Sequence, residues 1–190
     1  MILVRNSSPF IAQSGFALLI TILVISVVLA VGISLLNITV KQINLSITGR
    51  DSEVAFSAAQ AGIECAQIIL NQNIDYVSGS ALPGTVDCIG GSGTLTRTEN
   101  DPQANVDRYT HQQSWDVDDE AGDDVCTDFD IYVIDATGGD ETVTFSNQGI
   151  ETYTCDNGDV CAAVFSRGYN RACGELDSLR TVQREITITL

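Results

Sequence analysis

The chain has 190 residues and a formal net charge of −16, and 44% of its residues are hydrophobic. All 25 acidic residues lie at or after Asp51 but only six of the nine basic residues do, so this portion carries a net charge of −19. A domain with this charge repels phosphate backbones, and we therefore expect no nucleic-acid partner.

The first predicted element is an apolar helix over residues 16–36, preceded by the small polar pair Ser14-Gly15. No charged side chain occurs from Asn6 to Val40. As a helix, Phe16–Leu36 would be about 31 Å long, enough to cross a bilayer core of about 30 Å. The segment is too long for the apolar core of a cleaved secretory signal and lacks an A-x-A exit. A buried core helix is the alternative, but a domain of this size rarely hides so long an uncharged segment.

Helical periodicity continues beyond the apolar segment. No proline occurs from Ile11 to Leu82, so nothing in this range interrupts a helix. We expect one continuous helix from about Phe16 to about Asn73, with residues 37–75 forming an amphipathic stalk that needs a surface to pack on. The apolar positions recur at three- and four-residue steps, and they are Ile43, Ile47, Val54, Ala58, Ala61, Cys65 and Ile68.

Residues 76–190 are predicted to form a β-rich acidic head. The frequent Gly, Ser and Pro of residues 76–93 predict a loop, and residues 114–128 are predicted to form an acidic loop. Residues 95–109 are ambiguous, and one strand is expected there. Alternating runs follow, namely FDIYVID, ETVTFS, IETYT, VCAAVFS and TVQREITITL, and the turn sequences TGGD, NQG and DNGD separate the first four. The last run places Arg184 on an otherwise apolar face. These patterns predict an antiparallel sheet of four to six strands covered by the amphipathic half of the helix, which is an α+β fold.

All six cysteines follow the apolar segment, and they are Cys65, Cys88, Cys126, Cys155, Cys161 and Cys173. An even number beyond a membrane anchor favours disulfides in an oxidising compartment over buried free thiols. Cys155 and Cys161 flank a turn sequence and are the best single candidate pair. Cys65 lies on the helix, so a bridge from the helix to the head is sterically reasonable.

The basic residues flanking the apolar segment do not fix its orientation, since Arg5 precedes it and Lys41 and Arg50 follow it. The acidic, cysteine-containing portion indicates that the head lies outside the cytoplasm. We therefore expect a single-pass membrane protein.

Eleven acidic residues and no basic residue lie between Asp116 and Glu141. Such a density of carboxylates is either solvated or bridged by a hard cation such as Ca²⁺. The loop is not an EF-hand, because Ala121 and Thr127 stand where that motif needs Gly and Glu. A solvated loop is the simpler interpretation, and the alternative is an irregular calcium site that uses Asp116, Asp118, Asp123 or Asp124. We expect no other cofactor.

The sequence offers no catalytic constellation. His111 is the only histidine, no CxxC motif occurs, and a lone histidine is more often structural than catalytic. We therefore expect that the protein is not an enzyme.

The pair Gly15-Phe16 and the run ALLITILVISVVLAVGISLL that follows it resemble the N-terminal region of type IV pilins and pseudopilins. The resemblance implies that residues 1–15 are a leader cut after Gly15 by a prepilin peptidase, and that Phe16 becomes a methylated N-terminus. It also implies that the partners are the membrane, other pilin or pseudopilin subunits and an inner-membrane assembly platform.

The fifth residue of the implied mature chain is Ile20, whereas the family usually has Glu there to neutralise the terminal ammonium of a neighbouring subunit. PilX-type minor pilins and the K-type tip pseudopilin of type II secretion commonly lack this Glu.

The stretch SEVAFSAAQAGIECA also resembles PilX-type proteins, and VFSRGYN and the final strand resemble small pilin-like heads more loosely. The resemblance thus implies a minor subunit at or near the tip of an extracellular filament, active in assembly or surface contact. The leader departs from the family by having Arg5 as its one base. The alternative is a single-pass signal-anchor protein with an acidic outer domain that binds a ligand or cations.

Overall fold

The structure is a computed structural model that describes residues 13–72, 82, 84–88, 91–116, 124–145 and 152–190. The chain divides into two compact units, Met1–Ile47 and Thr48–Leu190. The predicted leader, residues 1–15, lies mostly outside the described residues.

A single helix, α1 (Gln13–Gln72), contains 60 residues and continues without a break through the segment where the sequence lacks proline. Within the first unit, its side chains from Phe16 to Ile47 are exposed except at the half-buried Gly32. Leucine, isoleucine, valine and alanine dominate this part, and none of its apolar side chains has a core to enter. The second unit contains the remaining turns of α1 and the whole sheet.

Five antiparallel strands form the main sheet in the order β3-β4-β5-β8-β9. They are β3 (Thr96–Thr98), β4 (Val106–Asp116), β5 (Asp124–Asp135), β8 (Val160–Tyr169) and β9 (Gln183–Thr189). Two small antiparallel hairpins accompany it, one made of β1 (Thr85–Cys88) and β2 (Gly91–Thr94), the other of β6 (Glu141–Thr144) and β7 (Thr152–Cys155). A 3₁₀ turn, η2 (Cys173–Glu175), lies between β8 and β9.

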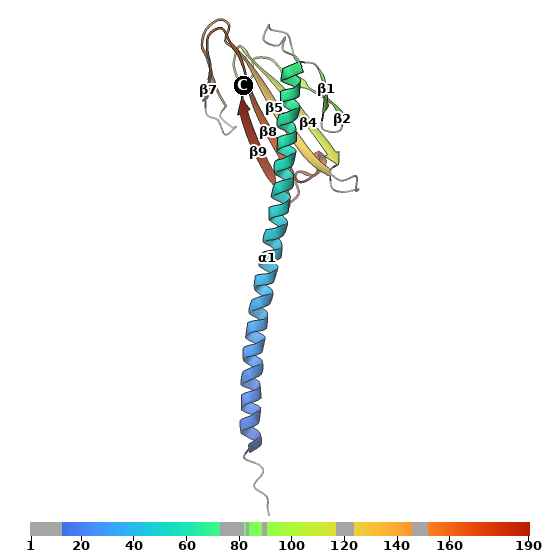
Figure 1. Ribbon diagram of the computed structural model, residues 1–190, viewed down its shortest axis with the longest axis vertical. Coiled ribbons are helices and arrows are strands. Elements are labelled where there is room, and N and C mark those ends of the chain that lie inside the picture. Colours follow the sequence, from blue (N-terminus) through green and yellow to red (C-terminus); the bar gives the residue numbers. More distant parts are fainter. Residues whose placement is uncertain (1–12, 73–81, 83, 89–90, 117–123, 146–151) are drawn as a thin grey trace, which may run out of the picture. The chain divides into compact units, whose positions relative to one another are not determined.

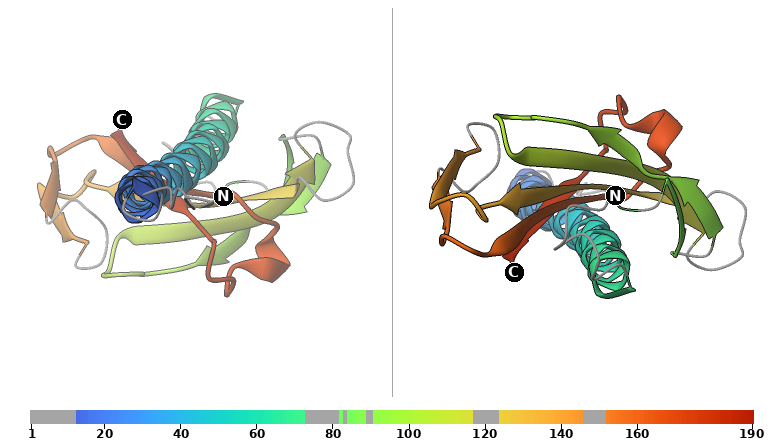
Figure 2. Two further views of the ribbon diagram at one scale, coloured as in Figure 1. Left: turned by 90° about the horizontal axis from the view of Figure 1, so that it is seen from below. Right: turned by 90° about the horizontal axis from the view of Figure 1, so that it is seen from above.

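The later turns of α1 and the main sheet form two layers, with the helix crossing one face of the strands (Figures 1 and 2). Alternate residues of β5 point to opposite faces of the sheet. Phe129 and Ile131 join the core between helix and sheet, whereas Tyr132 and Ile134 join a second core on the other face. Residues of β6 and β7 cover this second core. The structure therefore confirms the predicted α+β fold.

The second core is built around three aromatic rings. Tyr132 meets Phe145 and Phe165 edge to face, with ring centroids 4.8 and 5.6 Å apart, and Phe145 lies 5.1 Å from Phe165. Such geometry adds roughly 0.5–1.5 kcal/mol per pair beyond burial of the rings. The rings anchor the β6–β7 hairpin over one end of the sheet.

The buried stripe of α1 differs from the predicted one. Of the predicted positions, Ala58 and Cys65 are buried, Val54 and Ala61 are half-buried, and the three isoleucines are exposed. The buried residues of α1 are mostly small, and they are Ala55, Ala58, Ala59, Gly62, Ile63, Cys65, Ala66, Ile69 and Leu70. The prediction used hydrophobicity and therefore included the three isoleucines, which are exposed. The close approach of helix and sheet instead favours small residues at the buried positions.

Two loop assignments in the head were wrong. The segment 76–93, predicted as a loop, contains β1 and part of β2. In the segment 114–128, predicted as an acidic loop, residues 114–116 belong to β4 and residues 124–128 to β5. The segment 95–109, where the sequence was ambiguous and one strand was expected, contains β3 and the start of β4. These strands carry polar residues on one face, and their backbones are satisfied by pairing with neighbours that sequence periodicity does not reveal.

The turns and the last strand agree with the sequence. The TGGD and DNGD sequences link β5 to β6 and β7 to β8, and Gly158 adopts a φ of 92°, which favours glycine. The NQG sequence lies outside the described residues. Arg184 lies at the exposed start of β9 and its Nε donates to Ser52 Oγ at 2.8 Å, which accounts for its place on an apolar face.

Candidate functional site

The first candidate site is the exposed apolar part of α1. This helix is long and apolar enough to span a membrane, with a mean hydropathy of 3.0 in its most apolar window. Phe16 and Ile20 are 70% and 44% exposed, so neither is held by the fold of the monomer. A contiguous exposed apolar surface of this kind is typical of a site that contacts a membrane or another protein.

Two hydroxyl groups within this segment donate to carbonyl oxygens of the same helix. Thr21 donates to the carbonyl oxygen of Leu18 at 2.8 Å, and Ser26 donates to that of Leu23 at 2.7 Å. An unsatisfied hydroxyl would be costly in hydrocarbon, whereas these bonds remove that cost. Thr21 and Ser26 are therefore compatible with an apolar environment.

Gly15, the predicted cleavage residue, and Phe16 both lie in the first turns of α1. A Cβ added to Gly15 would meet nothing within 4 Å among the described residues. Packing therefore gives no reason for glycine at this position. By contrast, Gly62 and Gly168 are glycines because the helix and the sheet approach each other closely there.

The helix-to-sheet contact is held by small side chains and two buried hydroxyls. A Cβ at Gly168 would collide with the backbone of Ala55 and Ala59. Ser166 Oγ donates to the carbonyl oxygen of Ala59 at 2.7 Å, and Thr127 Oγ1 donates to that of Ala58 at 2.9 Å. Sequence reasoning missed this contact, although the glycine in VFSRGYN and the small residues of SEVAFSAAQAG were signals of close packing.

All six cysteines form disulfides. Cys65 on α1 pairs with Cys88 on β1, Cys126 on β5 with Cys173 in η2, and Cys155 with Cys161 across the β7–β8 turn. The last pair is the one expected from the spacing, and the first is the expected bridge from the helix to the head. Three such bridges are typical of a domain that folds in an oxidising compartment.

The predicted calcium ligands are only partly described. Asp116 and Asp124 are opposite each other at the end of the β4–β5 hairpin, and Asp118 and Asp123 lie outside the described residues. Among the residues that the structure describes, no three His, Cys, Asp or Glu side chains form a metal-binding group. Calcium binding through these four aspartates stays a prediction.

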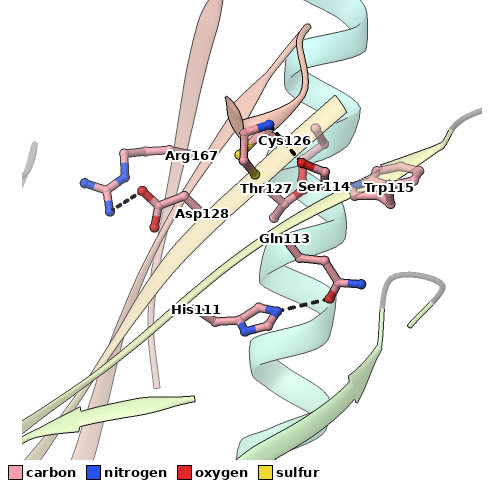
Figure 3. Close-up of a disulfide and its surroundings, with 10 residues drawn as sticks. His111, Gln113, Ser114, Trp115, Cys126, Thr127, Asp128 and Arg167 are labelled. Carbon is pink, nitrogen blue, oxygen red and sulfur yellow. Dashed lines mark hydrogen bonds and ion pairs between the residues drawn. A yellow bond between two sulfur atoms is a disulfide. The ribbon is translucent and has the colours of Figure 1, made fainter. Parts of the chain in front are cut away.

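His111 is buried, and both of its ring nitrogens are engaged. Nδ1 lies 2.9 Å from the carbonyl oxygen of Thr94. Nε2 lies 3.1 Å from Gln113 Oε1, a contact that Figure 3 shows. Its ring also packs on Phe129, with centroids 5.1 Å apart. These contacts give the histidine a structural role, tying β4 to the β2–β3 segment.

A second candidate site lies on the sheet face opposite α1, around a buried carboxylate. Asp130, whose side chain is 1% exposed, accepts hydrogen bonds from Arg108 Nε and Nη2 at 3.1 and 3.0 Å and from Arg167 Nη2 at 2.6 Å. Arg167 Nη2 also lies 3.2 Å from Asp128 Oδ2. Figure 3 shows the Arg167–Asp128 pair. We call these four residues the Asp130 cluster.

Burial changes the titration of this cluster. Desolvation raises the pKa of Asp128, although the positive charge of Arg167 opposes the shift. Desolvation also works against the charged form of Arg167, but attraction to Asp128 and Asp130 outweighs it and the pKa of Arg167 is raised. Desolvation likewise opposes the charged form of Arg108, but attraction to Asp130 outweighs it and the pKa of Arg108 is raised. Both guanidinium groups are therefore held in place as cations. Sequence reasoning missed this cluster, and the one signal was a carboxylate in the middle of the apolar run FDIYVID.

Comparisons of the chain with protein-family models, with curated proteins and with solved structures gave no match. The class of protein is therefore defined by its architecture. It is a disulfide-bonded α+β protein with one N-terminal helix long and apolar enough to cross a membrane.

Proposed function

We propose that this protein is a minor pilin-like subunit of a type IV pilus or a type II secretion-like filament, located at or near the tip. Its role is assembly or surface contact, not catalysis. The observation that carries the proposal is that one helix contains both an uncharged exposed segment and a small-residue face that packs on an antiparallel sheet. A subunit of this kind can leave the bilayer only if neighbouring apolar helices replace the lipid around Phe16–Leu36.

The cysteines support an orientation with the head outside the cytoplasm. Cytosolic thiols are kept reduced, whereas this head has three disulfides. The alternative of a plain signal anchor with an acidic ligand-binding or cation-binding domain shares this orientation. Cleavage after Gly15 and recovery with filaments separate the two functions.

The mature N-terminus is the decisive measurement. Mass spectrometry of the membrane-extracted protein, with and without the prepilin peptidase, is expected to find a methylated peptide beginning at Phe16 only when the peptidase is present. Gly15→Val should block this processing. Gly32→Val is the matched control, because position 32 also has no neighbour within 4 Å and lies in the same helix. An uncleaved chain in both strains would leave the signal-anchor alternative.

Placement at the tip depends on Ile20. In a filament body, an unpaired terminal ammonium buried among apolar helices would cost several kcal/mol, and a carboxylate at this position would offset that cost. Ile20→Glu should therefore increase the number of copies per filament, counted by quantitative mass spectrometry of sheared filaments. Ile22→Glu carries the same charge at a position where no ammonium is expected, and it should lower incorporation. Equal behaviour of the two variants would contradict tip placement.

A further inference from the structure

A hollow of about 480 Å³ lies on the sheet face opposite α1, next to the Asp130 cluster. Its lining also includes Thr94, Thr96, Thr110, His111 and Gln112. The volume falls within the range of about 300–1,000 Å³ that is usual for small-molecule sites. Polar side chains make up most of this lining, so its occupant has to be polar.

The charges of the hollow are already paired with one another. Two arginines and two aspartates of the Asp130 cluster line it, and their formal charges cancel. An anion would have to compete with the carboxylates for Arg108 and Arg167, and it would approach a domain that carries −19. A cation would meet the guanidinium groups. Electrostatics therefore favour an uncharged ligand.

His111 also lines the hollow, but both of its ring nitrogens are engaged with Thr94 and Gln113. The other polar groups of the lining can both donate and accept hydrogen bonds. The three threonine hydroxyls do so, and the amide of Gln112 offers separate donor and acceptor atoms. The cluster holds the neighbouring arginines and Asp128 fixed, because Asp130 accepts from Arg108 at 3.0 Å and from Arg167 at 2.6 Å. A lining that is fixed before binding loses little side-chain entropy when a ligand arrives.

We propose that this hollow binds a neutral saccharide. Sugar hydroxyls donate and accept hydrogen bonds at neighbouring positions, which matches the mixed lining, and a neutral sugar is not repelled by the acidic head. The inference goes beyond the proposed function and holds whether or not the chain enters a filament. It assigns the sheet face opposite α1 as the contact surface of the head.

The test uses the full chain in phospholipid nanodiscs, because glycoside detergents carry sugar head groups that would compete. Saturation-transfer NMR and titration calorimetry would compare a panel of neutral oligosaccharides with acidic oligosaccharides and with inorganic phosphate. We expect at least one neutral oligosaccharide to bind, and the acidic probes and phosphate to bind more weakly than it does.

Substitutions in the lining test whether the oligosaccharide binds in this hollow. Thr110→Val and Gln112→Ala remove hydrogen-bonding groups of the hollow without touching the Asp130 cluster, and each should weaken binding about tenfold. Gln183→Ala is the matched control, since Gln183 is exposed on β9 and does not line the hollow. Unfolding temperatures of all variants should equal that of the parent. The proposal is overturned if no neutral oligosaccharide binds the folded parent, if the hollow variants bind as the control does, or if acidic probes or phosphate bind more tightly.

Discussion

Ser166 on β8 donates its hydroxyl hydrogen to the main-chain carbonyl oxygen of Ala59 on α1, at 2.7 Å and in a fully buried position. A hydroxyl can reach a helical carbonyl only if the helix backbone lies close to the sheet. Ala59 and the adjacent Gly62 allow this approach, because a larger side chain at either position would separate the layers. The junction between helix and head is thus made by backbone and small side chains.

Gly168→Ala should be strongly destabilising. The added Cβ collides with the backbone of Ala55 and Ala59, which cannot move like a flexible side chain. Overpacking of this kind costs roughly 1–3 kcal/mol, occasionally more. Chemical denaturation of the full chain measures the change. Gly174→Ala is the control, because its Cβ meets nothing within 4 Å, and its effect should stay below about 0.5 kcal/mol. Equal effects would show that the layers are not in close contact.

Thr127→Val should cost more than the loss of one hydrogen bond. Thr127 Oγ1 donates to Ala58 and also accepts from Trp115 Nε1 at 3.0 Å, so valine leaves the indole N–H without this acceptor. The expected cost is about 1–3 kcal/mol. In a Trp115→Phe background the cost of Thr127→Val should be smaller, because the indole donor is already absent. Additive effects in this double-mutant cycle would contradict an energetic coupling between Trp115 and Thr127.

Asp130→Asn should lower the free energy of unfolding by about 3 kcal/mol, because it leaves two partly buried arginines without their shared carboxylate. Denaturant titration against the parent gives the value. Asp124→Asn, at the exposed start of the same strand, is the matched control and should have little effect. A tolerated Asp130→Asn would mean that the two arginines are stable without this carboxylate.

Two carboxylates of β5, Asp128 and Asp135, should have pKa values shifted in opposite directions from the usual value of an aspartate. Burial raises the pKa of Asp128, so its contribution to stability is present at acid pH and is lost as the pH rises through its folded pKa. Hydrogen bonds from the hydroxyl and the backbone N–H of Thr137 lower the pKa of Asp135. Its contribution is present above the unfolded pKa and is lost as the pH falls through the folded pKa. NMR titration of the side-chain carboxyl carbons should give a higher midpoint for Asp128, and the reverse order would refute this assignment.

The disulfides should differ in their contribution to stability according to the length of chain they enclose. Cys126 and Cys173 are 47 residues apart, whereas Cys155 and Cys161 are six apart. Loop-closure entropy predicts about 4 kcal/mol for the longer loop and about 2 kcal/mol for the shorter one. Replacing both cysteines of one pair by serine, followed by thermal unfolding under oxidising conditions, tests the order. Equal losses would indicate that native-state contacts outweigh chain entropy.

The sequence predicted the long helix, the antiparallel sheet and the Cys155–Cys161 pair because each depends on local pattern. It did not predict which side of α1 is buried, since Ile68 is more hydrophobic than Ala59 and only the geometry of the sheet favours the smaller residue. The sequence did not predict the Asp130 cluster either, because its members meet only through tertiary structure. Arg108, Asp130 and Arg167 are far apart in the chain, and strand register alone brings them together.

The contacts that join α1 to the sheet have a consequence for the time course of synthesis. Ala58, Ala59 and Ser52 bond to residues that lie 69, 107 and 132 positions later in the chain. A ribosome adds about 5–20 residues per second, so the helix waits for several seconds before its partners exist. During that interval its small-residue face lacks its partners on the sheet, although Cys88, the partner of Cys65, is only 23 residues later in the chain than Cys65. A nascent chain of this kind needs the translocation machinery, or a chaperone beyond it, to shield the helix until β9 has been made.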